Sequence, residues 1–188
     1  MRARMALHYA GIEWEHREIE LKNKPAQMLE ISPKGTVPVL LLENNQVIDE
    51  SLDIMLWALS QNDPERWLPD LHRDDIFNLI EQNDTIFKPA LDRYKYPNRY
   101  PDEDCSNARD DGLKILEELN RRIANNGALS GNKNTLADYT IFPFIRQFAH
   151  VDKDWFNDQP IPDLRKWFNT HINSKLFTAI MEKHPIYT

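Results

Sequence analysis

The sequence predicts an α/β domain followed by an all-helical domain. Hydrophobic periodicity and turn residues in the first 61 residues indicate the order helix, strand, helix, strand, strand, helix. After residue 74 the apolar residues recur only at helical spacing. Five glycines against twelve prolines in 188 residues favour helices separated by prolines over a β protein with glycine turns.

The elements of the first domain follow from local patterns. Helices are predicted over residues 1–10, 25–31 and 51–61, and Gly11 should end the first of them. Residues 14–19 alternate weakly and are predicted to form a strand. Two further strands, at 39–42 and 47–48, should be joined by a turn at Asn44 and Asn45. Domain boundaries are therefore expected at 1–62 and 75–188, with a linker between them.

The second domain should consist of helices only. They are predicted at 75–94, 105–124, 139–151, 163–172 and 174–184. Thr135 and Asp138 have the spacing of a capping box, in which a hydroxyl and a carboxylate satisfy backbone N–H groups at a helix start. We assign these two residues a structural role, without catalysis.

Composition narrows the classes of partner. The net charge is −7 and the pI about 5.4, which argues against nucleic acid or an anionic membrane as the main partner. A single cysteine fits the reducing cytoplasm. The six histidines do not recur at metal-ligand spacing, so no metal is expected. Cys105 lies among acidic residues, which raise a thiol pKa, and is interpreted as a bystander.

The most informative stretch is 32–51. Pro38 precedes an apolar run, so it should lie at or before the start of a strand, and the Val37–Pro38 bond is expected to be cis. Glu50 and Ser51 stand where a helix begins, where backbone N–H groups attract an anion and a carboxylate attracts a cation. A small site for a zwitterion is one interpretation. A solvated carboxylate beside an N-cap serine is the other.

Val37-Pro38 followed by Glu50-Ser51 resembles the glutathione-binding half of glutathione S-transferases, and residues 21–25 resemble their omega-like, cysteine-type branch. The resemblance implies a thioredoxin-like first domain. It also implies that the Val37 backbone pairs with the cysteinyl part of glutathione, that Glu50 and Ser51 hold the γ-glutamyl end, and that Lys24 approaches the glycine carboxylate. Pro38 would be structural. Taken alone, Lys24 is equally well interpreted as a solvent-exposed lysine.

In that branch a first strand and a cysteine-containing motif precede the first helix. Residues 1–7 resemble the continuation of that motif, so the catalytic residue is expected upstream of Met1 and none is assigned here. The resemblance implies that the full-length form carries out glutathione-dependent thiol transfer, reduction or conjugation with an electrophile or a disulfide, as a homodimer. The rival hypothesis is a non-catalytic binding or regulatory module. By resemblance, Phe87, Tyr94, Tyr96 and Tyr100 could line a co-substrate pocket, although aromatics at such spacing are usually core.

Overall fold

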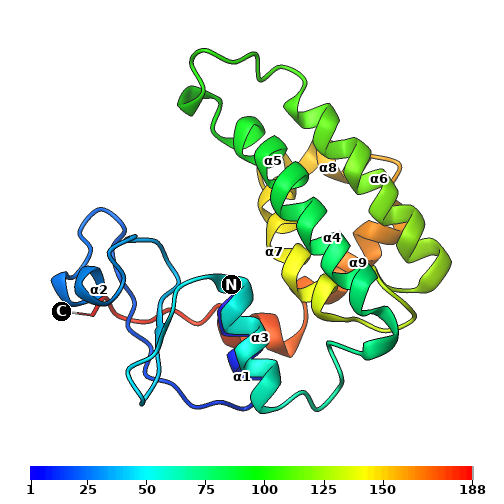
Figure 1. The fold of residues 1–188 in the computed structure, drawn as a ribbon. Helices are drawn as coiled ribbons and strands as arrows, with labels where there is room; N and C mark the ends of the chain where they lie inside the picture. Colours follow the sequence, from blue (N-terminus) through cyan, green and yellow to red (C-terminus); the bar gives the residue numbers. More distant parts are fainter. Residues whose placement is uncertain (188) are drawn as a thin grey trace. The chain divides into compact units, whose positions relative to one another are not determined.

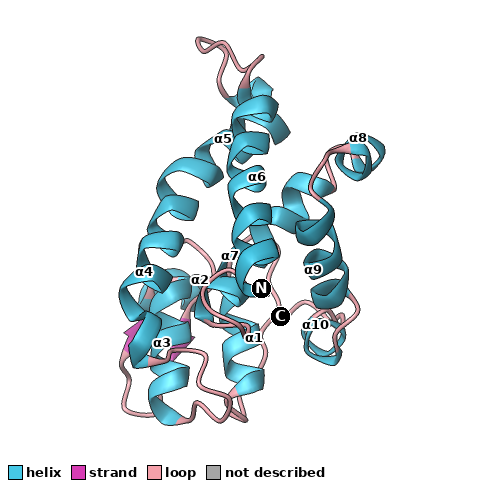
Figure 2. Ribbon diagram, turned by 90° about the vertical axis from the view of Figure 1, so that its right-hand side faces the viewer, coloured by secondary structure: helices cyan, strands magenta, loops and turns pink. Residues whose placement is uncertain are grey.

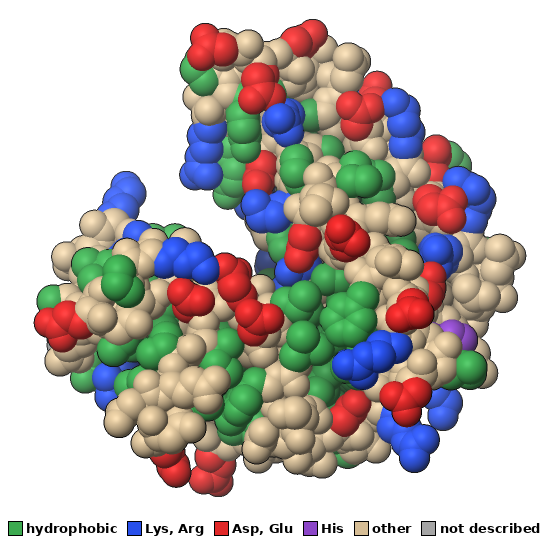
Figure 3. All heavy atoms as spheres, viewed as in Figure 1, with side chains coloured by type: hydrophobic (Ala, Val, Ile, Leu, Met, Phe, Trp, Pro, Cys, Tyr) green, Lys and Arg blue, Asp and Glu red, His purple; other side chains and the backbone are tan. Residues whose placement is uncertain are grey.

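The computed structural model describes residues 1–187, which form two compact units. The first comprises Met1–Glu65 together with the segment that begins at Ser174, and the second comprises Arg66–Asn173. Helices dominate both units, and among the described residues the strands are confined to one short hairpin (Figure 2). Acidic and basic side chains are interspersed over the face shown in Figure 3.

The first unit is built on two packed helices and a hairpin. Its elements are α1 (Arg2–Tyr9), α2 (Ala26–Ile31), β1 (Leu40–Leu41), β2 (Val47–Ile48), α3 (Ser51–Gln61) and α10 (Lys175–Ile180) (Figure 1). Met5 and Ala6 of α1 and Met55 and Ala58 of α3 are almost completely buried and form the core between these helices. Gly11, at φ +68°, follows the end of α1 as predicted.

The hairpin has the predicted turn. The N–H of Asn45 donates to the carbonyl of Leu42 over 2.9 Å, and Asn45 itself adopts a φ of +65°. The side chain of Asn44 accepts a hydrogen bond from the N–H of Gln46 at 3.0 Å. Asparagine tolerates the left-handed region and stabilises turns through its side chain, so these residues join β1 to β2.

The predicted strand at 14–19 is wrong. In the described part of the chain its backbone makes one ladder contact, a parallel bridge between Glu18 and Ile186. The N–H of Tyr187 donates to the carbonyl of Glu18 over 2.8 Å. Alternation alone does not make a strand, because a ladder needs a neighbour along its length.

The second unit is a helical bundle. Its helices are α4 (Arg73–Gln82), α5 (Lys88–Lys95), α6 (Ala108–Asn126), α7 (Leu136–Ala149), α8 (Lys153–Asp158) and α9 (Pro162–Ile172). Single 3-10 turns occur at Asp70–His72 and Pro97–Arg99, and a π-helical turn at Asn83–Phe87 separates α4 from α5. The apolar helix α7 supplies buried Ile141, Phe142, Ile145 and Phe148 and contacts α4, α5 and α9. No helix of the described residues has both the length and the apolar character to cross a bilayer.

Two details of the helical prediction differ from the structure. Helix α8 was not expected, although Asp152 caps it by accepting a hydrogen bond from the N–H of Trp155 at 3.0 Å. Helix α10 packs against α1 and is grouped with the first unit, whereas the sequence places everything after residue 75 in the helical domain. A periodic apolar pattern identifies a helix but does not identify its packing partner.

Candidate functional site

Predicted site residues flank the open end of the hairpin. Antiparallel pairing matches Leu40 with Ile48 and Leu41 with Val47. Val37 and Pro38 stand three and two residues before β1, and Glu50 and Ser51 stand two and three residues after β2, so both pairs lie beyond the open end of the hairpin. The Val37–Pro38 bond is cis, as expected, and Pro38 lies outside β1.

The start of α3 combines a carboxylate with backbone donors. Glu50 is the N-cap residue and Ser51 is the first helical residue. Within the described chain no side chain caps this helix end, so its first N–H groups lack a side-chain acceptor there. The side chain of Glu50 is 60% exposed and Val37 is 47% exposed, so a ligand can reach both. This arrangement suits a group that carries both an ammonium and a carboxylate.

Sequence reasoning missed Lys34 at this site. Its ammonium forms an ion pair and hydrogen bond with the carboxylate of Glu50, and Nζ lies 3.6 Å from Oδ1 of Asp49. The hydrogen bond to Glu50 and the nearby Asp49 charge raise the pKa of Lys34. These partners are fifteen or sixteen residues further along the chain, so no local pattern could have paired them.

Lys24 lies beside the same turn. A Cβ placed on Gly35 would be 3.7 Å from Nζ of Lys24 and 3.3 Å from a methyl carbon of Leu29. Gly35 also has a φ of +62°, a conformation that side-chain-bearing residues rarely adopt. Lys24 therefore approaches the backbone of the loop that carries Lys34, and all four predicted binding residues lie in the first unit around this loop and the hairpin end.

A cavity of about 950 Å³ adjoins Val37 and Pro38 within the first unit. Its walls are mainly apolar and come from α1, α2 and α3, from residues 14–19, from β1 and from the segment after α10. The cavity reaches only the Val37 side of the hairpin end. Glu50, Ser51 and both lysines lie outside its lining.

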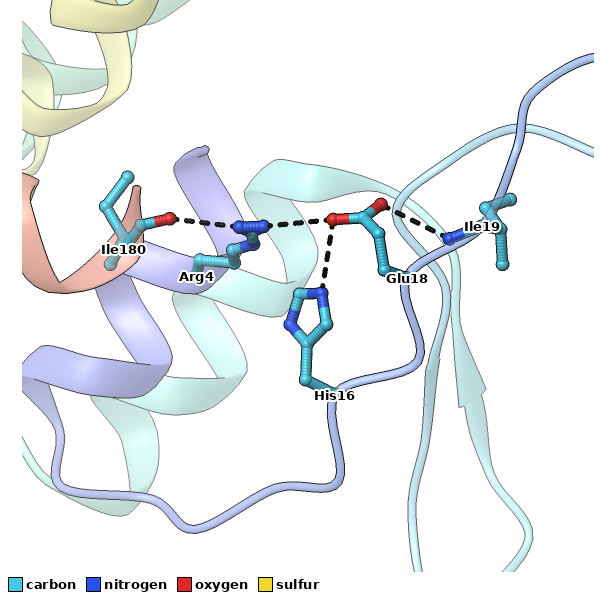
Figure 4. Close-up of polar contacts among 5 residues, drawn as sticks. All are labelled: Arg4, His16, Glu18, Ile19 and Ile180. Carbon is cyan, nitrogen blue, oxygen red and sulfur yellow. Dashed lines mark hydrogen bonds and ion pairs between the residues drawn. The ribbon is translucent and has the colours of Figure 1, made fainter. Parts of the chain in front are cut away.

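One rim of this cavity is a polar cluster (Figure 4). The guanidinium of Arg4 donates to the carbonyl of Ile180 at 2.9 Å and to the carboxylate of Glu18 at 3.3 Å. His16 lies 3.4 Å from the same carboxylate and stacks on His184 with ring centroids 4.0 Å apart. Burial, Arg4 and His184 lower the pKa of His16 more than Glu18 raises it. The cluster holds α10 and the segment after it against residues 16–18, which is a structural role.

The remaining candidates lie in the second unit. Thr135 and Asp138 form the predicted capping box at the start of α7. Phe87 is fully buried with its ring centroid 5.5 Å from that of Phe148, so it is a core residue. Tyr94 is half-buried, and its ring centroid lies 5.0 Å from that of Phe148. Cys105 is half-buried and stays without an assigned role. Among the described residues no group of three His, Cys, Asp or Glu side chains could hold a metal.

Two family models match this sequence. The model described as "Glutathione S-transferase, N-terminal domain" matches residues 1–61, and "Glutathione S-transferase, C-terminal domain" matches residues 82–175. The order of the matches confirms the predicted thioredoxin-like domain followed by an all-helical one.

The relatives include glutathione S-transferases and elongation factors. Glutathione S-transferase omega-1 of Mus musculus is 27% identical over 191 aligned positions, covering 98% of this chain and 72% of its own length. Glutathione S-transferase U19 of Arabidopsis thaliana is 26% identical, covering 89% and 77% respectively. Elongation factor 1-gamma of Drosophila melanogaster is 22% identical over 87% of this chain, which spans only 38% of that longer protein.

Solved structures share the fold. A glutathione S-transferase from Rhodospirillum rubrum F11 superposes with a TM-score of 0.78 at 20% identity, covering 99% of this chain and 89% of its own. The glutathione transferase URE2P6 from Phanerochaete chrysosporium, solved in complex with oxidized glutathione, gives 0.81 at 16% identity, covering 95% and 88%.

Proposed function

Because the chain belongs to the glutathione S-transferase family, we propose that its first unit binds glutathione at the hairpin end and the start of α3. The observation that carries this proposal is the exposed carboxylate of Glu50, which already binds an ammonium, that of Lys34. Glutathione presents an ammonium and a carboxylate on the same carbon at its γ-glutamyl end. Glu50 suits the first group, and the hydroxyl and N–H of Ser51 at the helix start suit the second.

The rest of the tripeptide has partners in the same unit. The backbone of Val37 would pair with the cysteinyl part, and Lys24 would face the glycine carboxylate. The ammonium of Lys24 would lie 3.7 Å from a Cβ on Gly35, next to the loop that carries Lys34. A carboxylate at Glu50 and an ammonium at Lys24 suit a tripeptide that carries charged groups at both ends.

The reaction we propose is glutathione-dependent thiol transfer, reduction or conjugation, in a cytoplasmic and dimeric protein of the omega-like class. In thiol transfer a thiolate attacks a disulfide, so that one S–S bond forms while another breaks and a thiolate leaves. The second substrate is an electrophile or a disulfide. The omega-1 relatives support this class.

The elongation factor 1-gamma relatives favour a second candidate, a transferase fold used as a binding module without catalysis. The two candidates differ in one measurement. With glutathione and a small disulfide such as hydroxyethyl disulfide, an enzyme raises the rate of thiol–disulfide exchange above the rate without protein, whereas a module binds glutathione and leaves that rate unchanged.

Calorimetric titration with glutathione tests the binding site. Glu50→Ala removes a charged hydrogen-bond partner, so the affinity should fall about ten- to hundred-fold, or about 1.5–3 kcal/mol. The matched control is Glu30→Ala, which removes an exposed glutamate from α2 and should leave the affinity unchanged. Equal affinities in the wild type and Glu50→Ala would rule out this role for Glu50.

A further inference from the structure

Lys34 lies between two carboxylates at the proposed site. Its ammonium binds Glu50 and also faces Asp49 at 3.6 Å. The three side chains together carry a formal charge of −1, and without Lys34 they would carry −2. Lys34 therefore sets the electrostatic character of the place where the ligand's charged end would bind.

The loop around Lys34 holds its backbone in place. The hydroxyl of Ser32 donates to Oδ2 of Asp49 over 3.1 Å, and the N–H of Gly35 donates to the carbonyl of Ser32 over 2.9 Å. The first bond ties the loop to the chain just before α3, and the second closes the turn that contains Lys34. The lysine side chain itself stays 46% exposed and can change its partner.

We propose that Lys34 is a specificity-determining residue. In the free protein its ammonium pairs with the carboxylate of Glu50; when the α-ammonium of the ligand pairs with Glu50 instead, Lys34 turns to the α-carboxylate of the ligand. This inference rests on the proposed function, because it concerns how the same site recognises the γ-glutamyl end of glutathione. The site then selects zwitterionic ends over ends that carry an ammonium alone.

The magnitudes permit this exchange. An ion pair this exposed is weak, so displacing Lys34 from Glu50 lowers ligand affinity by about five-fold at most. The ligand's ammonium forms an equivalent pair with Glu50, and Lys34 gains a new anionic partner. Without Lys34, Asp49 and Glu50 would still attract an ammonium but would repel the neighbouring carboxylate.

Calorimetry with two peptides tests the proposal. Glutathione is compared with 4-aminobutanoyl-cysteinyl-glycine, which keeps the ammonium and lacks the α-carboxylate. The wild type should prefer glutathione, and Lys34→Met should reduce the ratio of the two affinities by about three- to five-fold. Lys34→Arg retains the cation and should keep the wild-type ratio.

The outcomes separate this inference from the proposed function. If both peptides bind and the ratio is the same in the wild type and in Lys34→Met, the role of Lys34 is refuted while the glutathione site stands. If the wild type binds neither peptide, the proposed function and this inference both fail. A reduced ratio that Lys34→Arg restores would support selection by the Lys34 charge.

Discussion

The indole Nε1 of Trp167 donates a hydrogen bond to Oδ1 of Asp138 over 2.8 Å, across 29 positions in the sequence. The same oxygen accepts from the N–H of Leu129 at 3.1 Å. The other oxygen, Oδ2, accepts from the N–H of Thr135 at 2.8 Å and from its hydroxyl at 3.2 Å. Asp138 is fully buried, so one carboxylate joins the loop after α6, the start of α7 and helix α9.

Asp138→Ala should therefore lower the free energy of unfolding by about 3–5 kcal/mol. The variant loses the capping box, which contributes roughly 0.5–2 kcal/mol, and leaves buried donors unpaired at about 1–3 kcal/mol each. Urea unfolding followed by tryptophan fluorescence measures the change. Thr135→Ser keeps the hydroxyl that donates to Asp138 and should cost less than about 1 kcal/mol. An Asp138→Ala protein as stable as the wild type would contradict this account.

Helix α6 should not tolerate a larger residue at position 112. A Cβ on Gly112 would lie 2.4 Å from Cε2 and 2.9 Å from Cζ of Phe148 on α7. Alanine gains about 1 kcal/mol of helix propensity over glycine, but overpacking a core costs about 1–3 kcal/mol. Because Phe148 is itself buried and the approach is as close as 2.4 Å, the overpacking cost should be at the upper end of that range, so we expect Gly112→Ala to lower the free energy of unfolding by about 2 kcal/mol.

Gly11→Ala is the matched control for this change. A Cβ on Gly11 would meet nothing within 4 Å, so a lower free energy of unfolding in this variant comes from the φ of +68° alone. The decrease should be about 1 kcal/mol. Combining Gly112→Ala with Phe148→Leu separates a steric clash from a backbone effect. If the second substitution relieves none of the Gly112→Ala loss, contact with Phe148 is not its cause.

Features set by neighbouring residues could be predicted from the sequence. Gly11 ends α1, the two asparagines form the hairpin turn, and Thr135 with Asp138 caps α7. Each depends on backbone conformation or on hydrogen bonds within a few residues. The position of Pro38 before β1 and its cis bond belong to the same class.

Features set by distant partners could not be predicted. Residues 14–19 have a strand-like pattern but, within residues 1–187, make only one bridge, to Ile186. The packing of α10 against α1 depends on the tertiary fold. At the candidate site the sequence suggested Glu50 and Ser51 but not Lys34, because the chain must fold back before its ammonium reaches Glu50. Trp167 was not expected as a partner of Asp138 for the same reason.

Acid should destabilise the second unit through His171 on α9. The ring lies among Phe142, Trp167 and Tyr139, with centroid distances of 5.2, 4.4 and 5.4 Å, and burial lowers its pKa to about 4. In the unfolded chain His171 has its ordinary pKa of about 6.5. Its contribution to the free energy of unfolding is therefore fully present above that pH and is lost as the pH drops towards 4. When the pH is lowered from 7.5 to 5, this one group should lower the free energy of unfolding by about 2 kcal/mol, which urea unfolding at the two pH values measures. His171→Phe keeps a flat ring without a titrating group, so the variant should lose about 2 kcal/mol less free energy of unfolding than the wild type over the same pH range. If the free energy of unfolding falls equally with pH in the wild type and in His171→Phe, His171 is not the acid-sensitive group.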